Sequence, residues 1–378
     1  MHEGRFNHPF GCLGVLRGEC SDISATVDID LTNAFSEKAM RCSIHFAFLV
    51  TLGISASLFA QQYKVTGQIP IEGAGGWDYA YVDSANHTLY VTHGTEVQVV
   101  DLSTEKPTAK IVGMKRIHGV ATADDLNRGF ISDGRDNVVV VFDLKTDEIL
   151  QRIKAGTNPD AILYDASTGR VFAFNGRSGD VTAIDAKDGS VVGSVDLGGK
   201  PEFAASDGKG FIYDNIEDKS EMVKLDAKTL KMVNRWPLKG CEEPSGLAID
   251  TGAHRLFSVC DNQTMAVTDY DSGKVVATVP IGDGPDAAGY DADKKLVFSS
   301  NGEGTLTVVK QEGADKYSVV QTVKTEKSAR TMALDLKTHK IYLPAAQLGA
   351  APAPTEETPH PRPPVVPGSF HLVVVSPL

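Results

Sequence analysis

A repeat of about 42 residues is the feature that most restricts how this chain can fold. An Asp that closes a short apolar run and opens a turn returns at spacings of 42, 42, 41 and 43 residues. This first series consists of Asp101, Asp143, Asp185, Asp226 and Asp269, and Lys310 occupies its next position. A second series, in which each Asp precedes a turn and an apolar run, consists of Asp83, Asp124, Asp165, Asp207, Asp250, Asp291 and Asp335. The two series interleave over seven units.

The length and pattern of one unit match a four-stranded blade of a β-propeller. In the third unit, short strands are predicted at 159–164, 171–174, 181–184 and 191–197, with turns between them. Helical repeats have similar periods, but they need a sustained 3.6-residue periodicity that these short runs do not have. The recurring Asp residues fit a structural role, because Asp accepts hydrogen bonds from backbone N–H groups two residues on. The sequence therefore predicts an all-β, seven-bladed β-propeller with four-stranded blades.

The two ends of the repeat region complement each other. Residues 63–71 are similar to the outer strand expected at 274–281, yet they precede the first unit, and the last unit stops after a third strand at 371–375. We therefore expect the N-terminal strand to complete the last blade, which removes an open sheet edge. The segment 349–368 holds seven Pro residues and cannot form a central strand. It is predicted as an insertion in the last blade of a single domain spanning 61–378.

The first 60 residues differ from the repeat region. Arg41 follows Met40, and residues 44–59 form an uncharged apolar run that ends beside the small residue Ala60. This order is typical of a signal peptide spanning 40–60, and the run is too short to cross a membrane comfortably. We expect a periplasmic or secreted protein without a transmembrane segment after cleavage. Residues 1–39 are interpreted as a non-native upstream extension, with Met40 as the true start.

Charge and cysteine content restrict the partners and the redox chemistry. The chain has 49 Asp and Glu against 37 Lys and Arg, a net charge of −12, so nucleic acid is not an expected partner. Two of the five cysteines, Cys241 and Cys260, follow the signal segment. Cys241 precedes an inner strand and Cys260 ends the next strand, which makes a disulfide feasible in an exported protein. Two free, half-buried thiols are the alternative.

The segment Leu89-Tyr90-Val91-Thr92-His93 resembles the name motif of the YVTN-repeat, or YncE-like, propeller family, with His93 in place of Asn. The turn-and-strand endings at 185–195 and 269–282 are also similar to that family, and degenerate copies cover about 63–378. The resemblance implies a propeller fold and export. It implies no single activity, because propellers of this kind include redox enzymes, proteins that act on antibiotics, one relative linked with DNA, and many proteins without an assigned reaction.

The inner strands of a propeller begin around one mouth of its central channel. The residue five positions before each Asp of the second series marks this place: Asp78, Gly119, Asp160, Glu202, Ser245, Asp286 and Arg330. Trp77 and His118 directly precede two of these positions. The ends of the second strands are expected at the same face, with His93, Asp133, Asn175, Asp214, Cys260 or Asp261, and Asn301. The sequence thus predicts a ring of four carboxylates and one Arg, with a His and a Trp beside it.

Such a ring can hold several kinds of ligand. A hard cation fits the carboxylate oxygens, and a softer divalent metal fits His93, His118 and Glu202. A cationic or sugar-like ligand fits with Trp77 as its apolar platform. Polar residues that are merely hydrated at a channel mouth are the alternative, and nothing in the sequence requires a cofactor.

The leading interpretation is a monomeric binding or interaction scaffold that takes a protein, a small molecule or a saccharide at the channel mouth. The sequence contains no Gly-x-Ser-x-Gly elbow and no Cys-x-x-Cys-His haem site. The competing interpretation places an enzyme at the same mouth. This is either a lyase or hydrolase or a subunit of a redox complex, and the lyase or hydrolase would use Asp78, His118, Glu202 and Arg330.

Overall fold

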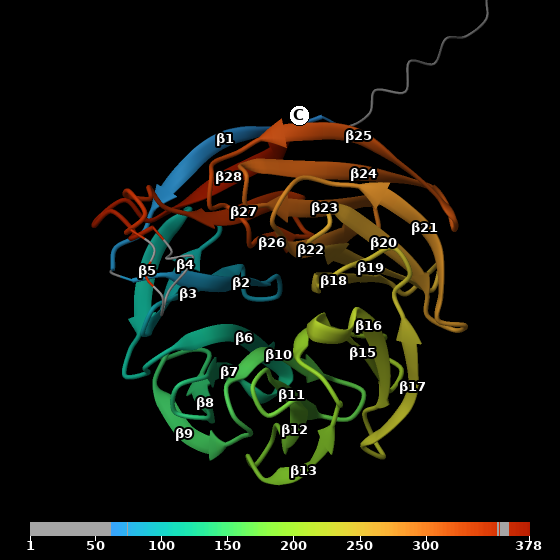
Figure 1. The fold of residues 1–378 in the computed structure, drawn as a ribbon. Coiled ribbons are helices and arrows are strands. Elements are labelled where there is room, and N and C mark those ends of the chain that lie inside the picture. The colour runs from blue at the N-terminus through green and yellow to red at the C-terminus, as the bar shows by residue number, and fades with distance from the viewer. Residues whose placement is uncertain (1–61, 74, 354, 356–362) are drawn as a thin grey trace, which may run out of the picture. The chain divides into compact units, whose positions relative to one another are not determined.

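The computed structural model describes residues 62–378, apart from 74, 354 and 356–362. These residues form seven four-stranded sheets that stand as blades in a ring, a seven-bladed β-propeller (Figure 1). The fold predicted from the repeat is therefore confirmed. The upstream extension at 1–39 and the signal peptide at 40–60 lie outside the described residues.

The first three blades follow the chain from an inner strand at the channel to an outer strand at the rim. Blade 1 comprises β2 (Trp77–Asp83), β3 (Thr88–His93), β4 (Glu96–Asp101) and β5 (Lys106–Ile111). Blade 2 comprises β6 (Ile117–Ala123), a single 3-10 turn η1 (Asp124–Leu126), β7 (Arg128–Asp133), β8 (Val138–Asp143) and β9 (Ile149–Lys154). Blade 3 comprises β10 (Pro159–Asp165), β11 (Arg170–Asn175), β12 (Asp180–Asp185) and β13 (Val191–Asp196).

The next three blades repeat this plan. Blade 4 comprises β14 (Pro201–Ser206), β15 (Phe211–Ile216), a 3-10 turn η2 (Glu217–Lys219), β16 (Glu221–Asp226) and β17 (Lys231–Pro237). Blade 5 comprises β18 (Pro244–Asp250), β19 (Arg255–Cys260), β20 (Thr264–Asp269) and β21 (Lys274–Pro280). Blade 6 comprises β22 (Pro285–Asp291), β23 (Leu296–Asn301), β24 (Thr305–Gly313) and β25 (Lys316–Lys324).

Blade 7 joins the two ends of the repeat region. It comprises β26 (Ala333–Asp335), β27 (Lys340–Ala345), β28 (His371–Pro377) and, as its outer strand, β1 (Tyr63–Pro70). β1 runs antiparallel to β28 from the Tyr63–Pro377 pair to the Pro70–His371 pair, so the predicted closure is confirmed. The Pro-rich segment lies between β27 and β28, and its base is a short bridge between Leu348 and Val365.

The recurring Asp residues hold turns, as the repeat pattern indicated. Asp143 accepts hydrogen bonds from the backbone N–H groups of Lys145 and Thr146, at 2.8 and 3.0 Å. In the second series, Asp165 accepts one from Thr168 at 3.0 Å. These contacts satisfy backbone donors that a tight turn would otherwise leave unpaired.

The hydrophobic core lies between neighbouring blades. Between blades 7 and 1, for example, Leu89 and Val91 of β3 pack against Tyr342 of β27 and Leu372 of β28, and all four are buried. Each blade buries both faces in this way, so the strands at the middle of a blade are apolar along most of their length. The charged residues of the inner strands are left to the channel.

A β-bulge interrupts the inner strand near its start in six blades. β2 pairs at Trp77–His93 and again at Ala80–Val91, so Asp78 and Tyr79 together face the single residue Thr92. Register shifts at the corresponding place occur in β6, β10, β14, β18 and β22. A bulge leaves residues outside the ladder and changes the direction of their side chains. The inner-strand positions predicted to form the channel ring lie at these bulges.

Cys241 and Cys260 form a disulfide with a Cα–Cα distance of 5.4 Å. The bond joins the loop before β18 to the end of β19, the placement that the repeat register indicated as feasible. None of the helices in the described part of the chain has the length and apolar character needed to cross a membrane.

Candidate functional site

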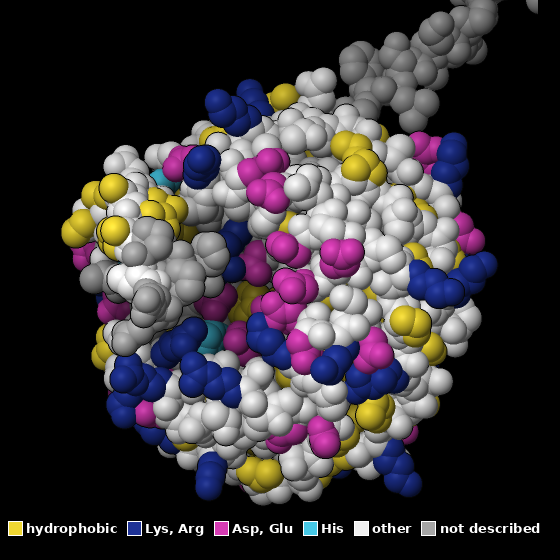
Figure 2. All heavy atoms as spheres, in the orientation of Figure 1, with side chains coloured by type: hydrophobic (Ala, Val, Ile, Leu, Met, Phe, Trp, Pro, Cys, Tyr) yellow, Lys and Arg dark blue, Asp and Glu magenta, His cyan; other side chains and the backbone are white. Residues whose placement is uncertain are grey.

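Charged side chains surround the mouth of the central channel. They are Asp78 on β2, Asp160 on β10, Glu202 on β14, Asp286 on β22 and Arg330 just before β26. Figure 2 shows Asp and Glu side chains gathered around a hollow at the centre of this face, with Lys and Arg side chains at its edge. Gly119 and Ser245 take the two remaining positions, and the Ser245 hydroxyl donates to the carbonyl of Pro285 at 2.9 Å.

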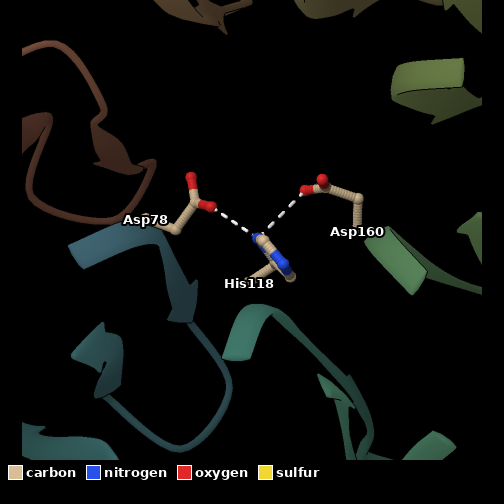
Figure 3. A group of neighbouring side chains, drawn as sticks. All are labelled: Asp78, His118 and Asp160. Atoms are coloured by element: carbon tan, nitrogen blue, oxygen red, sulfur yellow. Dashed lines mark hydrogen bonds and ion pairs between the residues drawn. The ribbon is translucent and has the colours of Figure 1, made fainter. Parts of the chain in front are cut away.

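His118 lies between two of these carboxylates. Its Nδ1 is 2.7 Å from Oδ2 of Asp78 and 3.4 Å from Oδ1 of Asp160, and the imidazole is 3% exposed. Figure 3 shows both carboxylates directed at the same ring nitrogen. Burial lowers the pKa of His118, but the hydrogen bond with Asp78 and the negative charges of Asp160 and Asp78 outweigh it, so the pKa is raised.

The other side of the imidazole is fixed by the backbone of blade 2. A Cβ atom at Gly134 would lie 2.6 Å from Nε2 of His118, so this position has to lack a side chain for the ring to fit. The Gly134 N–H donates to the carbonyl of Arg116 at 2.8 Å, which anchors the loop. Nε2 is buried and has no hydrogen-bond partner in the described part of the chain. Nδ1 is therefore the nitrogen that serves the carboxylates.

Cations offset only part of the negative charge at the mouth. Arg330 donates to Oδ2 of Asp286, and Lys200 pairs with Glu202 at 3.1 Å. Burial raises the pKa of both Asp160 and Glu202, and repulsion from neighbouring carboxylates adds to it, although Lys200 acts against the shift. Raised carboxyl pKa values indicate that the fully ionised ring carries more negative charge than its own cations neutralise.

Two aromatic rings form the floor of the mouth. Tyr79 follows Asp78 in the bulge of β2 and is 8% exposed. Its ring meets Phe203 of blade 4 edge-on at a centroid distance of 5.1 Å, and its hydroxyl donates to the carbonyl of Glu202 at 3.4 Å. A cavity of about 220 Å³ lies further along the inner strands and has both rings in its wall. The charged mouth is therefore a cup with an aromatic floor.

A groove of about 930 Å³ adjoins the cup. It shares Arg330 with the ring and extends toward the base of the Pro-rich insertion, where Leu348 and Val365 line it. Trp77 lines the same groove and packs against Phe370 at a ring-centroid distance of 5.2 Å. The sequence placed Trp77 and Arg330 at the mouth, but it gave no means of seeing where the insertion would lie.

The metal set predicted from the sequence, His93, His118 and Glu202, is not the set that the fold assembles. His93 stacks on Phe370 at 4.0 Å and its Nε2 lies 3.2 Å from the carbonyl of Gly75, while Glu202 pairs with Lys200. Among the described residues, the His and carboxylate ligand atoms that lie within 4.8 Å of one another belong to Asp78, His118 and Asp160. The strand end that carries His93 faces the neighbouring blade, which explains the difference.

The other second-strand ends also serve their own blades. Asn175 donates to the Thr182 hydroxyl at 3.0 Å, and Asn301 donates to the Thr305 and Thr307 hydroxyls at 3.0 Å. All of these contacts are within one hairpin. These Asn residues shape the turns at the mouth and do not belong to the charged ring.

Asp214 differs from its predicted place. β15 continues to Ile216, which pairs with Pro201, so Asp214 lies inside the strand. It is 1% exposed, and neither carboxyl oxygen has a hydrogen-bond partner in the described part of the chain. Burial, with a smaller contribution from the charge of Glu202, raises the pKa of Asp214 well above its usual range.

The sequence interpretation missed Lys200 and Tyr79. Lys200 ends the loop before β14, and its long side chain bends back to Glu202 and Glu217. Tyr79 is adjacent to a ring position, and ordinary strand alternation would have turned it away from that position. The bulge gives both neighbours a place at the channel, and no pattern in a single sequence marks a bulge reliably.

Comparisons with known proteins bear on the fold. No protein-family model and no curated protein matches this chain. Among solved structures 1806 chains match, a number that shows how widely the architecture is used. One of them is hydrazine synthase from Kuenenia stuttgartiensis, with a TM-score of 0.64 and 14% identity, covering 72% of this chain and 94% of that chain. Likeness at this identity shows the propeller scaffold and carries no activity with it.

Proposed function

We propose that this propeller is a binding protein that takes a cation in the cup at its channel mouth. Asp78, His118 and Asp160 are the proposed ligands, and a divalent transition metal is the ion that fits them best. The observation that carries the proposal is the convergence of two carboxylates on one imidazole nitrogen, at 2.7 and 3.4 Å (Figure 3). Mixed imidazole and carboxylate ligands suit metals such as Zn²⁺ and Mn²⁺.

The charge of the cup supports a cation in the same place. Asp160 and Glu202 have raised pKa values because burial and neighbouring carboxylates oppose their ionisation. A bound cation would relieve that repulsion. Metal at Nδ1 of His118 would also replace the proton that this nitrogen shares with Asp78, so binding and proton release are coupled.

The wider role proposed here is that of an exported scaffold of the YVTN-repeat kind. The motif at 89–93 and the apolar run at 44–59 support it. Its test is the N-terminus of the protein recovered from the native cell envelope or medium. A mature end near Ala60 is expected, and recovery of a cytoplasmic protein that retains 1–60 would contradict export.

Thermal stability measures the proposed site. The protein is stripped with a chelator and then titrated with Zn²⁺, Mn²⁺ and Ca²⁺ in separate experiments. Ligand at a hundred times its Kd adds ~2.7 kcal/mol, which raises Tm by roughly a few degrees in a chain of this size. We expect that shift with Zn²⁺ or Mn²⁺ and its loss in H118Q and in D160N.

The matched control is H254Q. His254 forms an exposed pair with Asp271 at the same 2.7 Å distance, but outside the cup. The shift should survive this change. A shift that persists in both H118Q and D160N, or its absence with all three ions, would remove the cup as a metal site.

An enzyme with its site in the cup is the second candidate. Raised pKa values at Asp160 and Glu202 favour it, because a carboxyl group that holds its proton near neutral pH can act as a general acid. The test is turnover of ester and glycoside substrates by the metal-loaded protein. Loss of that turnover in E202Q with metal binding unchanged would support catalysis, and equal turnover in E202Q would exclude Glu202 from it.

A further inference from the structure

The groove beside the cup has one apolar wall. Trp77, Leu348 and Val365 line it, and Leu348 and Val365 face each other across the short bridge at the base of the insertion. Leu348 is 42% exposed, which is high for a Leu in a wall with a Trp. Concave, partly apolar surfaces of this size accommodate small organic molecules.

The opposite side of the groove carries positive charge on a fixed loop. Lys327 and Arg330 both line the groove, and Ser328 lies between them with a φ of 80°. Three hydrogen bonds hold Ser328: its N–H donates to Gly302, its hydroxyl donates to Ala346, and its carbonyl accepts from the Arg330 N–H, at 3.0, 3.1 and 2.8 Å. A backbone held in a sparsely populated conformation by several contacts fixes the direction of its neighbours.

The acidic residues of the same rim already have partners. Asp283 accepts from the Gln263 amide at 3.2 Å, and Glu303 accepts from the Thr305 hydroxyl at 2.7 Å. Between them, Gly284 and Gly302 present bare backbone, because a Cβ at Gly302 would lie 3.2 Å from the carbonyl of Gly284. A ligand can therefore approach the floor closely, and the charge that remains to receive it is positive.

We propose that this groove binds a small organic carboxylate with an apolar body. The carboxylate lies between Lys327 and Arg330, and the apolar body packs on Trp77 and Leu348. Arg330 can serve this ligand and Asp286 together, since a guanidinium has five N–H donors in a planar fork. The site is distinct from the cation site in the cup and does not depend on it.

Trp77 provides the signal for a direct test. The chain has two Trp residues, so W236F leaves Trp77 as the single Trp of the whole protein. Its fluorescence is followed while cyclohexanecarboxylate, cyclohexylmethanol or cyclohexylmethylamine is added, since these probes share one body and differ in charge. A saturable change is expected with the carboxylate, with about ten-fold weaker binding of the alcohol because a charge-assisted contact is lost.

Two lysine variants decide where the charge is read. K327Q in the W236F protein should weaken cyclohexanecarboxylate binding about ten-fold and leave the alcohol unaffected. K324Q removes an exposed charge on β25 outside the groove lining and should change neither. Equal binding of the carboxylate and the alcohol, equal effects of K327Q and K324Q, or an unsaturable signal with all three probes would overturn the proposal.

Discussion

The side chain of Gln321 forms two hydrogen bonds with the backbone of Tyr63, from a position 258 residues away. Its Oε1 accepts from the Tyr63 N–H at 2.9 Å, and its Nε2 donates to the Tyr63 carbonyl at 2.8 Å. Gln321 lies on the outer strand of blade 6, and Tyr63 begins the strand that completes blade 7. The contact therefore fastens the segment that closes the ring.

Removing this contact should weaken closure. Q321A leaves a partly buried donor and acceptor of Tyr63 unpaired, so the free energy of unfolding should fall by about 1–3 kcal/mol. Urea denaturation followed by circular dichroism measures the change. Q321M keeps the volume of the side chain and loses both hydrogen bonds, so it should fall by a similar amount. Wild-type stability in Q321M would show that the two bonds contribute nothing.

The disulfide should contribute through the unfolded chain. Cys241 and Cys260 are 19 residues apart, and a cross-link that closes a loop of this length is worth about 3 kcal/mol. The double variant C241A/C260A should lose about that much in urea denaturation. Reductant should destabilise the wild type and leave the double variant unchanged. A reductant effect of equal size on both proteins would contradict the assignment.

Asp214 should make stability fall as pH rises. Its folded-state pKa is raised, so the folded protein keeps a proton that the unfolded chain releases above the ordinary carboxyl pKa of about 4. Stability from this group is complete below that value and is lost, by up to about 1.4 kcal/mol per pH unit, until the folded-state pKa is passed.

D214N removes the titration. Its free energy of unfolding should depend less steeply on pH between about pH 5 and about pH 8 than that of the wild type. D261N, at an exposed Asp, is the matched control and should keep the wild-type slope. Identical slopes in D214N and the wild type would show that Asp214 is ionised in the fold.

The proton on His118 should depend on Asp78. The hydrogen bond of 2.7 Å contributes to raising the pKa of the imidazole, so D78N should lower that pKa. Stability that comes from the shared proton is complete below the ordinary His pKa of about 6.5 and is lost as pH rises through the folded-state value. NMR titration of the imidazole signals, with H118Q used to assign His118, measures the shift. An unchanged pKa in D78N would show that Asp160 alone sets it.

The cup and the groove should influence each other through Arg330. A carboxylate in the groove competes with Asp286 for the guanidinium, which leaves more negative charge for a cation in the cup. Cyclohexanecarboxylate should therefore tighten Mn²⁺ binding several-fold, and Mn²⁺ should tighten the carboxylate by the same factor. Calorimetry of each ligand with and without the other measures both factors. R330Q should abolish the coupling, and retained coupling in R330Q would place its origin elsewhere.

The positions of the ring were predictable because the repeat fixes where each inner strand begins. Asp78, Asp160, Glu202, Asp286 and Arg330 therefore came from spacing alone. The partners of those residues were not predictable, because they depend on bulge geometry and on contacts between distant segments. His93 shows the limit: its neighbour Phe370 follows the Pro-rich insertion, and no periodicity relates the two. Lys200 shows another, since the reach of a long side chain is not recorded in spacing.

The bulges at the channel mouth have a consequence for descent. Residues such as Asp78 and Asp160 stand outside the hydrogen-bonded ladder, so their replacement leaves every strand pair intact. Lineages that inherit this scaffold can rewrite the mouth one blade at a time, and overall identity says little about whether two of them share a ligand. The informative comparison is a seven-letter word, read from positions 78, 119, 160, 202, 245, 286 and 330.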